Sequence, residues 1–208
     1  MIKAIIFDAD GVMVQSTYLS TRLLDKNEAT KWRWNKDLDV SKEVLDKFFG
    51  GPFQDCLVGK SDLKIEVEKV MKDWNWGGSV DELLEYWFRD EANKVDQRFE
   101  AVIGDLKKKG IVCGLGTNNE KHRTNDLVHN KGLGKWFAKH LHFSSANVGH
   151  KKPEPEYFAK VTRLLGFAPE EIAFWDDDVK NVESARLHGW QANHYTDFDV
   201  FVDWSNKL

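Results

Sequence analysis

The pattern of apolar and polar residues divides the chain into a first strand, a helical block, and a region of alternating elements. Ala4–Phe7 is an uninterrupted apolar run, which is typical of a parallel strand buried on both faces. From about residue 15 to residue 93, apolar residues recur at helical spacing, as in Val44–Phe49, and no buried strand is evident. We therefore expect an all-helical insert directly behind the first strand.

From residue 94 onward, apolar runs of strand length alternate with helical patterns. Further strands are expected at about residues 111–115, 141–143, 172–175 and 191–195, with helices between them. Alternating strands and helices with short connections are typical of a parallel sheet covered on both faces. The pattern therefore predicts an α/β core built from residues 1–14 and 94–208, with residues 15–93 as the helical insert.

Polar residues that could carry chemistry follow the expected strands. In chain order they are Asp8 and Asp10, Thr117 and Asn118, Lys152, and Asp176 and Asp177. Because the carboxyl ends of parallel strands share one edge of a sheet, these groups can converge. Paired carboxylates repel unless a cation lies beside them, and Mg²⁺ prefers oxygen ligands near phosphates. The set suits metal-assisted phosphoryl transfer, although Asp8, Asp10 and Gly11 taken alone would also suit a simple turn.

Four stretches resemble the motifs of the haloacid dehalogenase-like (HAD) hydrolase superfamily, and in particular of its phosphatases with a helical, C1-type cap. They are FDADGV at 7–12, GTNN at 116–119, KKPEPEYF at 151–158 and FWDDDVKNVESAR at 174–186. The helical insert also occupies the place of the family's cap. The resemblance implies a Rossmann-like core with an inserted helical cap, and a phosphatase that works through an aspartyl-phosphate.

The resemblance also implies roles for the motif residues. Asp8 would attack the phosphorus, and Asp10 would protonate the leaving oxygen and then deprotonate the attacking water. Thr117 and Asn118 would bind the phosphoryl group, and Lys152 would bind it and neutralise its charge.

The implied cofactor is Mg²⁺. Its ligands would be Asp8, the backbone carbonyl of Asp10, and Asp177, with Asp176 assisting. Asp178 stands where the family commonly has a small residue, and it could compete for the metal.

Composition sets the broad class. The 208 residues carry a net charge of −4 and are 41% hydrophobic, which suits a folded domain and gives no reason to expect nucleic acid or a membrane surface as partner. No run approaches the roughly 18 apolar residues of a membrane helix. Cys56 and Cys113 are the two cysteines, and Cys113 falls in an expected buried strand, so a disulfide is not expected. We expect a cytoplasmic enzyme, either a monomer or a homodimer.

The expected substrate is a small phosphorylated metabolite, with sugar phosphates as the leading class. Most of the tryptophans at 32, 34, 74, 76 and 87 are expected to pack the insert, with one or two facing the cleft. Two alternatives stay open: a sugar phosphomutase of the same family, and a non-enzymatic phospho-accepting regulator. Asp10 and the insert argue against the regulator, and Asp10 also argues against dehalogenase chemistry.

Overall fold

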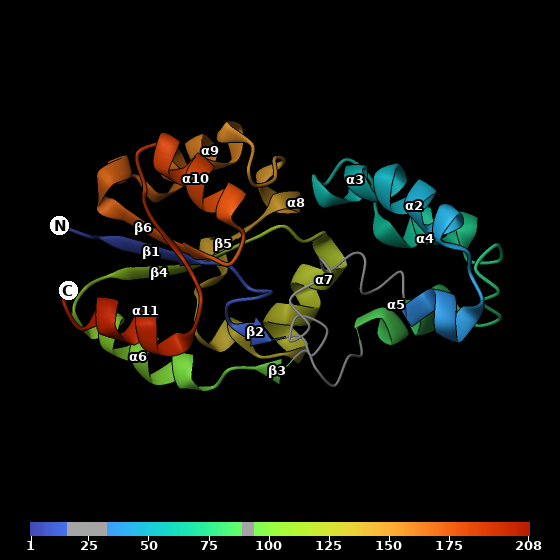
Figure 1. Ribbon diagram of the computed structural model, residues 1–208, viewed down its shortest axis with the longest axis horizontal. Helices are drawn as coiled ribbons and strands as arrows, with labels where there is room; N and C mark the ends of the chain where they lie inside the picture. The colour runs from blue at the N-terminus through green and yellow to red at the C-terminus, as the bar shows by residue number, and fades with distance from the viewer. Residues whose placement is uncertain (16–32, 89–93) are drawn as a thin grey trace.

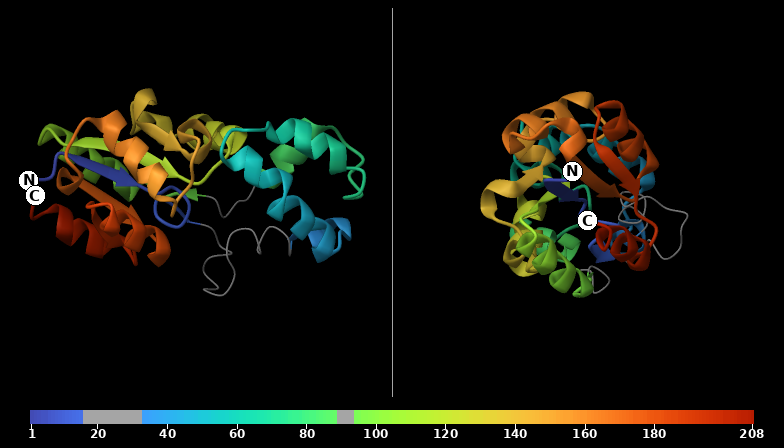
Figure 2. Two further views of the ribbon diagram at one scale, coloured as in Figure 1. Left: turned by 90° about the horizontal axis from the view of Figure 1, so that it is seen from above. Right: turned by 90° about the vertical axis from the view of Figure 1, so that its left-hand side faces the viewer.

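The computed structural model describes residues 1–15, 33–88 and 94–208. Within these ranges the chain forms an α/β core, which carries both chain ends, and a helical cap that lies beyond one end of the sheet (Figures 1 and 2). The predicted fold class, a parallel-sheet core with an inserted helical cap, is confirmed. The limits of the two parts, at residues 14/15 and 93/94, stay a prediction.

The core sheet has five parallel strands in the order β5-β4-β1-β6-β7. Their bounds are β1 Ala4–Phe7, β4 Val112–Thr117, β5 His142–Ser144, β6 Ile172–Asp176 and β7 Gln191–His194. In the register of the sheet, Phe7 lies between Leu115 and Trp175. The first strand is thus the middle of the sheet, and the residues that follow it have neighbours on both sides.

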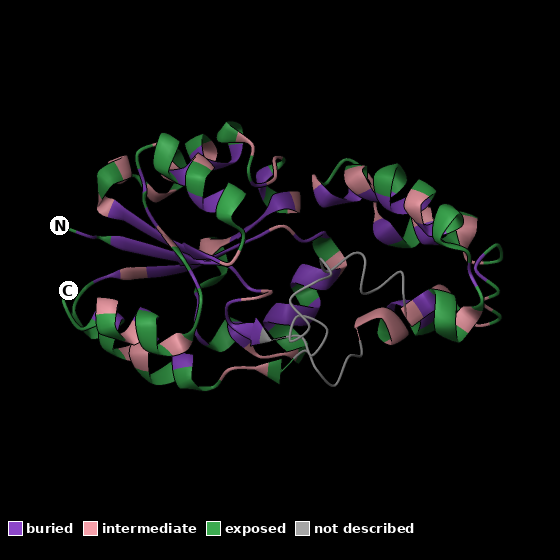
Figure 3. Cartoon of the chain, viewed as in Figure 1, coloured by how far each residue is buried: buried purple, intermediate pink, exposed green. Residues whose placement is uncertain are grey.

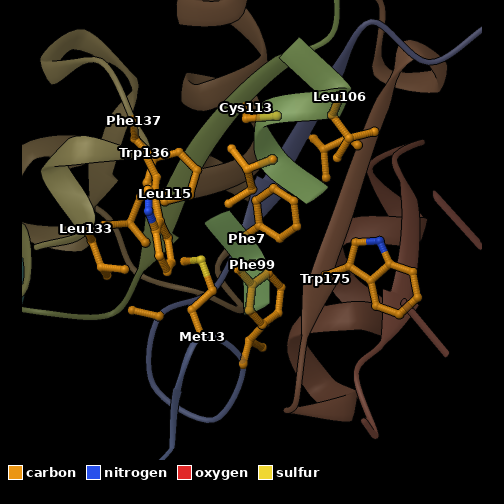
Figure 4. Close-up of a cluster of buried hydrophobic side chains, with 14 of the residues drawn as sticks. Phe7, Met13, Phe99, Leu106, Cys113, Leu115, Leu133, Trp136, Phe137 and Trp175 are labelled. Carbon is orange, nitrogen blue, oxygen red and sulfur yellow. The ribbon is translucent and has the colours of Figure 1, made fainter. Parts of the chain in front are cut away.

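Helices cover both faces of the sheet. The bounds are α6 Arg98–Lys108 and α11 Phe198–Ser205 on one face, and α9 Pro155–Leu165 and α10 Val179–Leu187 on the other (Figure 1). Because side chains alternate along a strand, Ile5 and Phe7 pack against α6 and α11, whereas Ala4 and Ile6 pack against α9 and α10. Figure 4 shows the buried cluster that contains Phe7, and Figure 3 shows that the strands of the core sheet are largely buried.

Shorter elements complete the core. These are α7 Lys121–Asn125, a π-helical turn at Asp126–Asn130, 3-10 turns at Leu133–Lys135, Lys139–Leu141 and Pro169–Glu171, and α8 Ser145–Val148. A two-stranded antiparallel ribbon, β2 Val14–Gln15 with β3 Lys94–Val95, joins the two ends of the insert. Each ribbon strand has two residues, which is too short for its apolar pattern to be recognised in the sequence.

In its described residues, the cap contains helical residues 33–38 and four further helices. These are α2 Lys42–Gly50, α3 Pro52–Leu57, α4 Leu63–Val70 and α5 Val80–Phe88. Ser41 and Asp62 begin α2 and α4, because their side chains accept hydrogen bonds from backbone amides of the first turn. Trp34 and Trp74 are fully buried and pack against each other in the cap's own core. Trp74 also packs on Phe48, and Trp34 packs on Phe49. These two tryptophans therefore cannot line a cleft.

Part of the expected helical insert lies outside the described residues. Within the expected insert, residues 16–32, which include Trp32, and residues 89–93 lie outside the described residues. Cys56 and Cys113 are both free and buried, and Cys113 lies in a buried strand, β4, as expected. Over the part of the chain that the structure describes, no helix combines the length and the apolar character needed to cross a membrane.

Candidate active site

A buried lysine joins two carboxylates at the carboxyl end of the sheet. Asp8 directly follows β1 and Asp176 ends β6, the neighbouring strand. The Lys152 Nζ atom lies 3.1 Å from Asp8 Oδ1 and 2.6 Å from Asp176 Oδ2. It also donates a hydrogen bond to the Gly116 carbonyl at 2.8 Å. All three charged side chains are buried, so this end of the sheet concentrates charge where solvent cannot screen it.

The surroundings shift the pKa of both Asp8 and Lys152. Burial raises the pKa of Asp8 well above its usual range, and the negative charges of Asp176 and Asp177 add to the increase, although Lys152 opposes it. Burial opposes the charge on Lys152, but Asp176 and Asp8 outweigh this effect and raise the pKa of the ammonium group. These shifts favour the ammonium form of Lys152 and oppose the ionisation of Asp8.

Three carboxylates form a cluster that could hold a cation. Ligand oxygens of Asp8, Asp176 and Asp177 all lie within 4.8 Å of one another. Burial, followed by the charge of Asp176, raises the pKa of Asp177 to about 6. Among the described residues, the cation that contacts this cluster is the ammonium group of Lys152, so three carboxylates face one positive charge. An all-oxygen donor set with excess negative charge fits Mg²⁺.

Gly11 allows Asp177 to approach the loop after β1. Its φ is +92°, in the left-handed region that favours glycine, and a Cβ at this position would overlap the Asp177 carboxylate. The glycine therefore leaves the space in which Asp177 can reach the backbone next to Asp10.

The three consecutive acids after β6 have different partners. Asp176 accepts hydrogen bonds from Asn181 Nδ2 at 3.1 Å and from the backbone amide of Asp178 at 2.8 Å. Asp178 accepts a hydrogen bond from the Lys180 backbone amide and is the N-cap of α10. Among the described residues, Asp178 is not in the carboxylate cluster, so the expectation that it could compete for a metal receives no support from the geometry.

The end of β4 supplies polar side chains opposite the acids. The Thr117 hydroxyl accepts a hydrogen bond from Asn119 Nδ2 at 2.7 Å. Asn118 donates to the Lys152 carbonyl at 2.7 Å and accepts from the Lys152 amide at 2.8 Å. The side chain of Asn118 thus fixes the backbone that carries the buried lysine, a contact that its spacing in the sequence does not reveal.

Two residues at this site, Asn119 and Arg123, are not predicted by the sequence patterns. Asn119 Nδ2 donates to Asp10 Oδ2 at 2.8 Å, and an Arg123 guanidinium nitrogen lies 3.1 Å from Asp10 Oδ1. Asn119 lies within the GTNN stretch, next to Thr117 and Asn118, which are expected to bind the phosphoryl group. Arg123 lies on a polar helix, where nothing in the periodicity distinguishes a buried arginine from a solvated one.

The cap contacts the core beside this site. Asp62 Oδ1 in the cap lies 2.8 Å from His122 Nε2 in α7, and Lys151 Nζ donates to Gln54 Oε1 of α3 at 2.5 Å. Gly59 lies so close to the Ala146 carbonyl that a side chain there would collide with it. These contacts hold the α3–α4 end of the cap against α7 and α8.

Comparison with known proteins identifies the family to which this arrangement belongs. The family model described as haloacid dehalogenase-like hydrolase matches residues 2–189. The chain belongs to this family. The expectation of an enzyme of the HAD-like phosphatase family is thereby confirmed at the level of the family, and the named relatives agree with it.

Two curated relatives of this HAD-like hydrolase are named phosphatases. A phosphatase of Mycobacterium tuberculosis is 24% identical over 208 residues, covering 92% of this chain and 86% of the relative. The N-acetylmuramic acid 6-phosphate phosphatase of Pseudomonas putida is 27% identical over 110 residues, which are 52% of this chain and 48% of the relative.

A solved structure shares the fold over nearly the whole chain. It is a HAD family enzyme of Bacteroides thetaiotaomicron in complex with magnesium and inorganic phosphate, with a TM-score of 0.77 and 20% identity. The similarity covers 97% of this chain and 99% of that one. The helical cap is therefore part of the shared fold as well as the sheet.

Proposed function

We propose that this HAD-like hydrolase is a Mg²⁺-dependent phosphatase that hydrolyses a small phosphomonoester through an aspartyl-phosphate. The observation that carries the proposal is the contact of Lys152 with Asp8, beside the carboxylates of Asp176 and Asp177. A lysine held as a cation supplies one positive charge to the nucleophile and to an incoming phosphate. The remaining negative charge calls for a divalent cation.

In the proposed first step, an Asp8 carboxylate oxygen attacks the phosphorus and the bond to the leaving oxygen breaks. Asp10 gives its proton to that oxygen, so the product leaves as an alcohol. In the second step Asp10 takes a proton from water, the water oxygen attacks the phosphorus, and the bond to Asp8 breaks. Inorganic phosphate is released and the Asp8 carboxylate is restored.

The proposed metal ligands are Asp8, the Asp10 carbonyl and Asp177, with Asp176 assisting. Bound Mg²⁺ would supply positive charge to the phosphate oxygens. Asp177 is the better candidate of the last two, because both oxygens of Asp176 already accept hydrogen bonds from protein groups.

Thr117 and Lys152 are the proposed phosphate-binding side chains. Thr117 is buried beside Asn119, where its hydroxyl keeps a proton to donate while accepting from the amide. We propose that Asn118 contributes through Lys152, because its side chain holds the lysine backbone at two points.

The proposed substrate class is a small phosphorylated metabolite, with a sugar phosphate first. The cap lies against α7 and α8, next to the catalytic end of the sheet, where closure would exclude water and limit substrate size. One relative carries the name of a sugar-phosphate phosphatase. We propose that the protein acts as a monomer or a homodimer. We propose that neither nucleic acid nor a membrane is its partner.

The test compares Asp8→Asn and Asp10→Asn with the wild type. Asp8→Asn should abolish turnover while its circular dichroism is unchanged, because only a carboxylate forms the acyl phosphate. In Asp10→Asn, rapid-quench measurement should show a phosphoenzyme that forms slowly and hydrolyses poorly, by about 10²–10⁴-fold. Near-normal kcat in Asp8→Asn would refute the nucleophile assignment.

The same measurements separate the alternatives. A regulator would hold its phosphoryl group for minutes without turnover, and a phosphomutase would transfer it to a sugar monophosphate in preference to water. A higher kcat/KM for phosphopeptides than for small sugar phosphates would contradict the substrate class.

A further inference from the structure

Arg123 lies buried between two carboxylates, only one of which belongs to the proposed catalytic set. One guanidinium nitrogen lies 2.7 Å from Asp126 Oδ2, three residues along the chain, and the other lies 3.1 Å from Asp10 Oδ1. The arginine side chain is only 7% exposed. Burying a charge is costly unless it is paired, and Asp126 alone already supplies a close partner. The contact with Asp10 therefore needs a further explanation.

The Asp10 carboxylate is held at both of its oxygens. Arg123 contacts Oδ1, and Asn119 Nδ2 donates to Oδ2 at 2.8 Å. Both partners come from the segment after β4, which is separated from Asp10 by more than 100 residues of sequence. Two contacts on different oxygens fix the rotation of the carboxylate as well as its position.

A third neighbour restricts the guanidinium from the side of the cap. The Arg123 Cζ atom lies 5.7 Å from the ring centroid of Phe88, the last residue of α5, within the range of a cation–π contact. Arg123 itself is anchored in the first part of α7, whose N-cap Glu120 accepts hydrogen bonds from the amides of His122 and Arg123. The planar fork is thus fixed by its helix, by Asp126 and by the cap.

We propose that Arg123 is a positioning residue that orients Asp10 for proton transfer to the leaving oxygen. Proton transfer requires the acid to lie within hydrogen-bond reach of that oxygen, so a carboxylate free to rotate would be a poorer catalyst. This inference rests on the proposed function of Asp10. The rigid guanidinium fork can contact Asp10 and Asp126 at once, whereas a lysine presents a single point charge.

The test uses two substrates that differ in their need for an acid. A simple alkyl phosphate releases a strongly basic alkoxide unless it is protonated, whereas p-nitrophenyl phosphate releases a stabilised phenolate. The kcat/KM value covers the steps up to release of this group, so it isolates the role of Asp10 as an acid. Arg123→Gln should lower kcat/KM for the alkyl phosphate by about 10–10²-fold, a part of the full effect of a general acid. For p-nitrophenyl phosphate the decrease should be less than about threefold.

The Arg123→Lys variant keeps the test valid even if Arg123→Gln fails to fold. It keeps a cation beside Asp126 but loses the fork, so it should fold and show the same selectivity for the good leaving group. Asn125→Ala, at an exposed position two residues further along α7, is the matched control and should leave both substrates unchanged. In an Asp10→Asn background, Arg123→Lys should cause no further selective loss.

The outcomes separate this inference from the function on which it rests. Equal losses for both substrates in a folded Arg123→Lys protein would overturn the positioning role. If Asp10→Asn itself lacks the leaving-group dependence, the assignment of Asp10 as the acid fails, and with it the basis of the inference.

Discussion

The carboxylate of Asp178 accepts a hydrogen bond from the Lys180 backbone amide at 2.8 Å and so begins helix α10. Its neighbour Asp177 instead lies in the cluster with Asp8 and Asp176. Three consecutive acids therefore occupy three environments: one paired with a lysine, one facing a candidate metal position, and one capping a helix. Substitutions at adjacent positions should have different consequences.

Asp177→Ala should raise the Mg²⁺ concentration needed for activity, whereas Asp178→Ala should not. Loss of the helix cap in Asp178→Ala should instead lower stability by about 1 kcal/mol. Activity titrated with Mg²⁺ after EDTA treatment, beside thermal unfolding, separates the two effects. The reverse order, or full wild-type activity after exhaustive chelation, would contradict the metal assignment.

Lys152→Met should abolish turnover and destabilise the protein. The substitution leaves the buried carboxylates of Asp8 and Asp176 without their cation, and breaking a buried ion pair typically costs about 3–5 kcal/mol. Lys151→Met is the matched control, because Lys151 is only partly buried and its ammonium group donates a hydrogen bond to the uncharged Gln54. Urea unfolding of both variants checks the prediction, and equal stabilities would contradict it.

Gly11→Ala should raise the Mg²⁺ concentration needed for activity and lower stability. The new methyl group would overlap the Asp177 carboxylate, and the φ of +92° would be strained for alanine. Gly104→Ala provides the control, since a Cβ there meets nothing within 4 Å and the residue lies inside α6. That control should gain about 0.5–1 kcal/mol of stability. A Gly11→Ala protein with unchanged Tm and Mg²⁺ titration would refute the proposed role of the glycine.

The contact between Asp62 and His122 should weaken in acid. Burial tends to raise the pKa of Asp62, but hydrogen bonds from His122 and the Lys64 amide outweigh it and lower the pKa. A carboxylate with a lowered pKa in the folded state stabilises that state at neutral pH, and the effect is lost as pH falls through this pKa. Because both side chains are partly exposed, the coupling should be below about 1 kcal/mol.

Asp62→Asn tests this contact without removing the helix cap, because asparagine is also a good N-cap. At pH 7 it should increase hydrogen exchange in residues 58–62, and a double-mutant cycle with His122→Asn measures the coupling. As the pH falls through the lowered pKa of Asp62, the difference in exchange between the wild type and the variant should shrink. Identical exchange at pH 7 would show that the contact does not hold the cap.

The sequence predicts the convergence of Asp8, Thr117, Lys152 and Asp176 because one rule of parallel sheets places all strand ends at one edge. It does not predict the contacts of Arg123. Hydrophobic periodicity shows which apolar side chains face inward, but a polar side chain is buried by the tertiary partners that satisfy it. The ion pairs of Arg123 and the cap–core contacts arise from such partners.

The sequence likewise does not predict the burial of Trp34 and Trp74 individually. Their spacing places them in the helical insert, but it does not say whether a tryptophan packs inward or lines a cleft. Only the packing of one cap helix on another decides this, through contacts such as those with Phe48 and Phe49.

The central position of β1 has a consequence for the order in which the molecule is built during translation. This strand is synthesised before the cap, yet both of its neighbours, at residues 112–115 and 172–175, are synthesised after the cap. Among the described residues, the cap core draws on residues 34–88, so its contacts are closer in sequence and are expected to form faster. The nascent chain can therefore complete the cap while β1 still lacks both neighbouring strands, and the proposed phosphoryl transfer must await synthesis of Asp177.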